Sequence, residues 1–124
     1  MKVSFDLDGT AWKYRDLFSE LAHALVARAH EVGILTGHED ETDNHKGIRQ
    51  ADLHLWKARG FPEASFLLNA TDCRRAGIPW HGVGQREWKA ELARRSGVAL
   101  HIDDWGTNDR IEFMPITQAD QTKE

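Results

Sequence analysis

The feature that most restricts the fold of this chain is the alternation of short apolar runs with longer segments of helical periodicity. Short β-prone runs occupy residues 2–5, 32–35, 65–68 and 98–102. Segments with apolar residues at helical spacing lie between them, at residues 16–30, 46–59 and 85–95. This order predicts parallel strands joined by right-handed crossovers. We therefore expect an α/β fold, namely a three-layer α/β/α sandwich around a Rossmann-like, mostly parallel sheet.

Two further segments complete the expected fold. Residues 111–116 predict a fifth strand at an edge of the sheet, because Pro115 is poorly tolerated in a central strand. Residues 69–84 contain Gly77, Pro79 and Gly82 and are predicted to form a long loop. The chain of 124 residues has the length of one domain. We expect a single domain over residues 1–116 and a polar tail over residues 117–124.

Charge and composition exclude several classes of protein. The 16 Lys and Arg residues against 20 Asp and Glu residues give a net charge of −4, which argues against a broadly basic surface that coats nucleic acid. Cys73 has no second cysteine with which to form a disulfide. No apolar run approaches the ~20 residues of a membrane helix, and Asp6 interrupts any apolar region of a signal peptide. These observations predict a cytoplasmic protein without a membrane partner.

The ends of the predicted strands carry the polar residues of greatest interest. The first strand runs into Asp6 and Asp8, the second into Thr36, and the fourth into Asp103 and Asp104. Ligands of such folds bind beyond the carboxyl ends of the strands, where these residues would converge. Crowded carboxylates repel one another unless a cation neutralises them, and a hard cation such as Mg²⁺ prefers oxygen ligands. A divalent metal site next to a phosphate cradle is therefore expected.

These residues also carry a family resemblance. The segment Asp6-Leu7-Asp8-Gly9-Thr10 resembles the first signature of the haloacid dehalogenase-like hydrolases, which are mostly phosphatases. Residues 34–37, Lys89 at the start of a helix and residues 100–104 are similar to the second, third and fourth signatures, in that order. The resemblance extends from residue 1 to about residue 109. Family members that cleave carbon–halogen or carbon–phosphorus bonds lack an acid at the position of Asp8, so the resemblance favours phosphate esters.

The resemblance implies a role for each matching residue. Asp6 would be the nucleophile that forms a phospho-aspartate, and Asp8 would be the general acid and then the general base. Thr36 and Gly37 would bind the phosphoryl group, and Lys89 would neutralise its charge and that of the nucleophile. The Mg²⁺ ligands would be Asp6, the main-chain carbonyl of Asp8, and Asp103 or Asp104.

Several assignments have alternatives. We favour the pair Asp103 and Asp104 at the metal, because Asp103 directly follows Ile102, but Asp104 with Asp109 also fits the fourth signature. Lys46 is the alternative to Lys89, and Arg86 lies on the same approach. Three further residues border the expected cleft in sequence and are left as candidate substrate contacts: Trp12, His38 and Trp105.

The expected function is that of a small Mg²⁺-dependent phosphatase acting on phosphate monoesters. No segment is long enough for a substantial cap domain, so the site is expected to be open, with a homo-oligomer as one way to cover it. Nucleotides or nucleic-acid ends are the first substrate candidates, small phosphorylated metabolites the second and phosphoproteins the third. The alternatives are a non-catalytic phosphate-binding or regulatory domain of the same fold, and a phosphotransferase.

Overall fold

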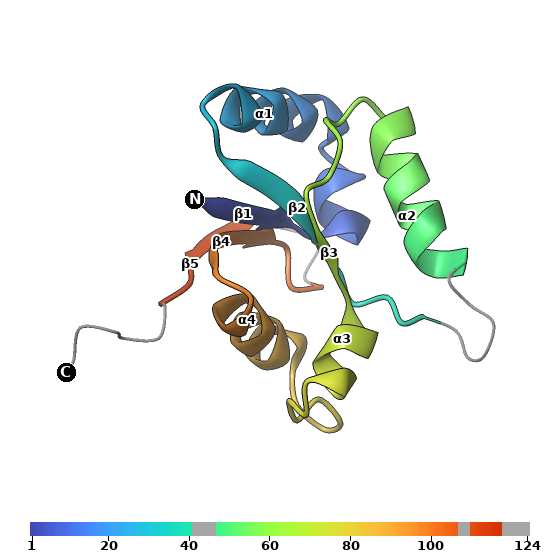
Figure 1. Ribbon diagram of the computed structural model, residues 1–124, viewed down its shortest axis with the longest axis vertical. Helices are drawn as coiled ribbons and strands as arrows, with labels where there is room; N and C mark the ends of the chain where they lie inside the picture. Colours follow the sequence, from blue (N-terminus) through green and yellow to red (C-terminus); the bar gives the residue numbers. More distant parts are fainter. Residues whose placement is uncertain (41–46, 107–109, 118–124) are drawn as a thin grey trace.

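The computed structural model describes residues 1–40, 47–106 and 110–117, and its centre is a mixed, mostly parallel sheet (Figure 1). The strand order is β3-β2-β1-β4-β5. The strands are β1 (Lys2–Phe5), β2 (Glu31–Leu35), β3 (Leu67–Leu68), β4 (Val98–Asp103) and β5 (Glu112–Pro115). Strands β1 to β4 pair in parallel and β5 pairs antiparallel with β4. The predicted α/β class and the predicted edge strand are both confirmed.

Helices cover both faces of this sheet (Figure 1). Helices α1 (Arg15–Ala27) and α2 (Gly47–Ala58) lie on one side, and α3 (Ala70–Arg75) and α4 (Gln85–Arg95) lie on the other. One buried cluster joins Val3 and Phe5 of β1 to Phe18 of α1 and Trp56 of α2. A second cluster joins strand residues to α3 and α4 and includes Leu35, Cys73, Trp88, Leu92 and Val98. Successive strand residues point to opposite faces, so one sheet supports both clusters.

Helix α3 corrects the prediction of a long loop over residues 69–84. Asn69 caps this helix, because its side-chain oxygen accepts the Thr71 N–H at 3.0 Å and the Asp72 carboxylate accepts the Asn69 N–H at 2.9 Å. The helix has only 6 residues and is too short to show an apolar period in the sequence. Its capping residues were the available signal.

Two predicted boundaries are also corrected. The first helix ends at Ala27 rather than at residue 30, because Ala29 has a φ of 68°, outside the right-handed helical region. Strand β3 covers Leu67–Leu68 rather than residues 65–68. Within the described ranges, none of the helices has both the length and the apolar character needed to cross a membrane.

Candidate active site

The loop after β1 places Asp6 and Asp8 at the carboxyl end of the sheet. Its turn, η1 (Leu7–Ala11), is closed by hydrogen bonds from Ala11 N–H to the Asp6 carbonyl at 3.2 Å and from Trp12 N–H to the Leu7 carbonyl at 3.0 Å. Gly9 has a φ of 78°, and a Cβ atom there would lie 2.3 Å from Oδ2 of Asp104. Only glycine therefore allows this loop to approach Asp104 so closely.

Three carboxylates meet where β1 and β4 end side by side. The Asp6 N–H donates to the Ile102 carbonyl at 2.9 Å, which fixes the end of β1 against β4. Asp6, Asp103 and Asp104 are all buried, and each offers a carboxylate oxygen within 4.8 Å of the others. This donor set fits a hard divalent cation, which oxygen ligands bind at about 2.0–2.6 Å. The convergence expected from the strand ends is present for these residues.

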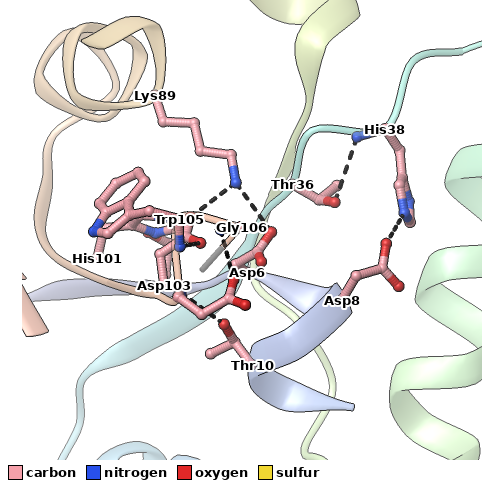
Figure 2. A network of polar contacts seen from close by, with 12 residues as sticks. Asp6, Asp8, Thr10, Thr36, His38, Lys89, His101, Asp103, Trp105 and Gly106 are labelled. Atoms are coloured by element: carbon pink, nitrogen blue, oxygen red, sulfur yellow. Dashed lines mark hydrogen bonds and ion pairs between the residues drawn. The ribbon is translucent and has the colours of Figure 1, made fainter. Parts of the chain in front are cut away.

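Lys89 reaches the same carboxylates from α4, as Figure 2 shows. Its Nζ lies 3.0 Å from Oδ1 of Asp6 and 2.8 Å from Oδ2 of Asp103. The Lys89 side chain is only 1% exposed, and its ammonium group also lies 5.8 Å from the centre of the Trp105 ring. The placement agrees with a lysine that neutralises the predicted nucleophile.

The pKa values of Asp6 and Asp103 are shifted in opposite directions. Burial, aided by the negative charge of Asp103, raises the pKa of Asp6 from 3.8 to about 7 even though Lys89 opposes the shift. Burial also disfavours the ionised form of Asp103, but the hydrogen bond from His101 and the charge of Lys89 outweigh it and hold the pKa of Asp103 well below its usual range. A cation bound beside Asp6 would therefore favour its ionised form and oppose the effect of burial.

His101 and Ser4 form a second layer beneath the acids, and sequence reasoning did not identify them. Nε2 of His101 lies 2.8 Å from Oδ2 of Asp103, and Nδ1 lies 2.7 Å from Oγ of Ser4. Burial lowers the pKa of His101, which favours the neutral ring. A neutral ring that donates from Nε2 to Asp103 accepts the Ser4 hydroxyl at Nδ1. The two residues are partners in the pairing of β1 with β4. Polar residues inside two apolar strands were the signal.

Backbone amides fix the other acid oxygens. Oδ1 of Asp103 accepts the Trp105 N–H at 2.8 Å, and Oδ1 of Asp104 accepts the Gly106 N–H at 3.2 Å. The Asp104 N–H donates to Oγ1 of Thr10 at 3.1 Å. Backbone amides therefore hold both acids of the pair, and Lys89 also holds Asp103.

A pocket of about 300 Å³ opens above the acids. Five predicted site residues line it: Asp6 and Asp8 after β1, Thr36 and Gly37 after β2, and Asp104 after β4. The Thr36 N–H donates to the Leu68 carbonyl at 3.0 Å, which fixes the end of β2 against β3. The remaining lining residues are Gly9, His38, Gln85 and Gly106, of which Gln85 and Gly106 were not predicted from the sequence.

His38 lies between Asp8, as Figure 2 shows, and Asp52 of α2. Its Nε2 lies 2.8 Å from Oδ2 of Asp8, and its Nδ1 lies 2.8 Å from Oδ2 of Asp52. The hydrogen bond to Asp52 and then that to Asp8 outweigh burial and raise the pKa of His38 to about 9. Both ring nitrogens therefore donate to carboxylates. Asp52 was not singled out from the sequence.

Trp12 and Trp105, two of the candidate substrate contacts, are not among the residues that line the pocket above the acids. Trp12 packs against Trp56 and Phe61 at ring distances of 6.4 and 6.1 Å, within the α1 and α2 core rather than in the pocket. Trp105 borders a second pocket of about 610 Å³ that shares Asp104 with the first. That pocket is also lined by Arg86, Arg110, Ile111, Glu112 and Phe113.

Arg86 is part of this second pocket and does not reach the acids. Its guanidinium forms an ion pair with Glu112 and lies 5.4 Å from the Trp105 ring centre. Lys46 and Asp109, the alternatives for the lysine and the second metal ligand, lie outside the described residues.

Comparisons of the chain with protein-family models, with curated proteins and with solved structures find no match.

Proposed function

We propose that this chain is a small, capless, Mg²⁺-dependent phosphatase of the haloacid dehalogenase-like type, with the three-layer sandwich of that family. The observation that carries the proposal is the buried group of Asp6, Asp103 and Asp104. Lys89 binds Asp6 and Asp103, and Asp6 and Asp104 line an open pocket. Asp8 and Thr36 lie around the same pocket. A carboxylate nucleophile, a second acid and a cation site are what phosphate ester hydrolysis requires.

In the proposed reaction, a carboxylate oxygen of Asp6 attacks phosphorus. The bond between phosphorus and the ester oxygen breaks, and Asp8 gives its proton to the departing alcohol. Asp8 then accepts a proton from a water molecule that attacks the phospho-aspartate, which releases inorganic phosphate and restores Asp6. Thr36 and the amide of Gly37 would hold the phosphoryl oxygens. Mg²⁺, held by Asp6, the Asp8 main-chain carbonyl and Asp103 or Asp104, would stabilise negative charge on those oxygens.

The second pocket supports a nucleotide or a nucleic-acid end as the substrate, ahead of a small phosphorylated metabolite. It adjoins the acids through Asp104 and presents two aromatic rings, Trp105 and the 50% exposed Phe113, together with Arg110. An aromatic ring beside a cation suits the base of a nucleoside leaving group. We expect a higher kcat/KM for a nucleoside monophosphate than for glycerol phosphate.

The first experiment measures hydrolysis of p-nitrophenyl phosphate with Mg²⁺ or with EDTA. Asp6→Asn removes the nucleophile, and we expect turnover to fall at least about 10³-fold. EDTA should abolish wild-type turnover and excess Mg²⁺ should restore it. Asp16→Asn is the matched control, because the Asp16 side chain is fully exposed on α1.

Three outcomes separate the proposed function from its alternatives. Turnover in Asp6→Asn close to that of the wild type would remove Asp6 as the nucleophile. Phosphate binding without any trapped phospho-enzyme would favour the non-catalytic alternative. Transfer of the phosphoryl group to an added alcohol at the expense of water would indicate a phosphotransferase.

A further inference from the structure

Three hydrogen-bonded side chains, Asp8, His38 and Asp52, lead in that order from the pocket into the interior. His38 follows β2, Asp8 follows β1 and Asp52 lies in the middle of α2, so three separate segments meet at one imidazole. Burial increases along this series of side chains, since Asp8 is 71% exposed, His38 31% and Asp52 9%. The exposed acid is thus tied to a buried one through a ring.

Asp52 is unusual in its own helix. Asp52 and Trp56 are the buried residues of α2 and lie one helical turn apart, on the face that packs against the core. A carboxylate on such a face is disfavoured unless a partner compensates for its lost hydration. The structure gives it Nδ1 of His38 at 2.8 Å. Packing alone would favour an apolar residue at this position, so the Asp52–His38 pair requires a different explanation.

We infer that His38, oriented by Asp52, is a positioning residue that holds the Asp8 carboxyl group for proton transfer to the leaving group. Asp52 binds one ring nitrogen and so fixes the ring plane, and the other ring nitrogen then restrains Oδ2 of Asp8. Oδ1 of Asp8 lies outside that hydrogen bond and is the oxygen assigned to the proton transfer. The inference rests on the proposed function, because it assigns Asp8 as the acid of that reaction.

The geometry explains why an exposed acid needs such support. An aspartate side chain that is mostly in solvent samples several rotamers, and a general acid acts only within hydrogen-bond reach of the oxygen that it protonates. In Figure 2 the Asp8 side chain points toward His38 and away from Lys89. Without the ring, Asp8 would be correctly placed for only a fraction of the time.

The test compares two phosphate esters with different leaving groups. Protonation of the leaving group matters little for p-nitrophenol and strongly for an alkyl alcohol, so the ratio of the two kcat/KM values reports on Asp8. A ratio also cancels any loss of folded protein. We expect His38→Leu to lower kcat/KM for the alkyl ester about 10- to 100-fold and for the p-nitrophenyl ester less than about threefold. His38→Gln should restore much of the ratio, because its amide can still donate to Asp8.

Asp52→Asn gives the second arm and has a matched control. We expect Asp52→Asn to lower the ratio of kcat/KM for the alkyl ester to kcat/KM for the p-nitrophenyl ester about fivefold, because a neutral amide restrains the ring less than a carboxylate does. Asp40→Asn is the control. Asp40 lies in the segment between β2 and α2, as His38 does, and its side chain is 10% exposed, but it binds Arg49 instead of His38. The ratio in this control should equal that of the wild type.

The outcomes distinguish this inference from the proposed function. Wild-type ratios in His38→Leu and Asp52→Asn, in a protein whose turnover depends on Asp6, would overturn the positioning role alone. Equal loss for both esters would also overturn it, because the variants would then affect binding or folding rather than protonation. Absence of any Asp6-dependent turnover in the wild type would overturn the proposed function and this inference together.

Discussion

Lys89 is the residue on which the charge balance of the acidic group depends. It is almost completely buried and contacts Asp6 and Asp103 at once. Removing one partner of a buried ion pair leaves an uncompensated charge, which costs about 3–5 kcal/mol. The positive charge of Lys89 also lowers the pKa of Asp6, against the larger effect of burial. The side chain thus contributes to stability and keeps the predicted nucleophile closer to its ionised form.

We therefore expect Lys89→Met to unfold at a lower urea concentration than the wild type in EDTA, with about 3 kcal/mol less free energy of unfolding at neutral pH. The pKa of Asp6, followed by carboxyl NMR, should move above its wild-type value of about 7. Turnover should be lost. Lys57→Met, an exposed change on α2, serves as the control. An unchanged unfolding midpoint in Lys89→Met would contradict this account of the buried pair.

At the scale of the elements, Arg49 ties α2 to its neighbours. Its guanidinium binds Asp40 at 2.9 Å, the Leu67 carbonyl of β3 at 3.2 Å, and Asn69 and Asp72 at the start of α3 at 3.1 and 2.8 Å. Burial disfavours the ionised form of Asp40, but hydrogen bonds from Asn69 and Arg49 outweigh it and lower the pKa of Asp40 below 3.8. One side chain therefore joins elements from both faces of the sheet.

We expect Arg49→Met to lose about 2–3 kcal/mol of unfolding free energy at pH 7, because charge-assisted hydrogen bonds contribute about 1.5–3 kcal/mol. Asp40 has a lower pKa in the folded protein than in the unfolded chain, so its contribution is present above its ordinary pKa of 3.8 and is lost as the pH falls through the folded value. The difference between Arg49→Met and the wild type should therefore narrow below pH 3.8. Urea unfolding at pH 7 and at about pH 3 measures this difference in unfolding free energy. Arg15→Met, a change at an exposed residue, is the control. An equal difference at both pH values would show that Asp40 is not involved.

The elements also show what the sequence could and could not predict. The helix at Gln85–Arg95 was found because Trp88 and Leu92 lie one turn apart on its buried face. Parallel strands bring their carboxyl ends together, so Asp6, Thr36 and Asp103 could be grouped without coordinates. These are consequences of periodicity and chain direction, which a sequence carries directly.

Other residues depend on information that a sequence carries only indirectly. Ser4 and His101 contact each other because of the register between β1 and β4, and register does not follow from either strand alone. Asp52 looks like an ordinary surface acid until α2 is packed, and its role then depends on which face of the helix is buried. Polar residues within otherwise apolar strands or helix faces therefore indicate positions that contact a functional site.

For the whole molecule, the two buried clusters share one sheet. Trp56 belongs to the cluster under α1 and α2, and Trp88 belongs to the cluster under α3 and α4. Neighbouring residues of the same strands contribute to both, since Ile34 lies in the first cluster and Leu35 in the second. Loss of either cluster would expose one face of the strands that support the other.

We accordingly expect residues 1–116 to unfold in one cooperative transition, as a single domain does. Trp12→Phe/Trp56→Phe removes the tryptophans that pack in the first cluster, and Trp80→Phe/Trp88→Phe/Trp105→Phe removes those that pack in the second. Urea unfolding followed by fluorescence should coincide with unfolding followed by far-UV circular dichroism in both variants. Separate midpoints for the two probes would show that the two sides of the sheet unfold independently.

The central place of β1 has a consequence for how the protein is made. Ser4 and His101 are 97 residues apart in the chain, and the Asp6 amide is satisfied by a carbonyl of β4. Because synthesis proceeds from the N-terminus, β1 leaves the ribosome long before β4 and waits with one edge unpaired. Long-range pairing of this kind forms slowly and leaves an open edge vulnerable to other chains. The group of Asp6, Asp103 and Asp104 is assembled only when β4 pairs with that edge. A nascent chain would therefore acquire the proposed cation site and its protection from aggregation in the same event.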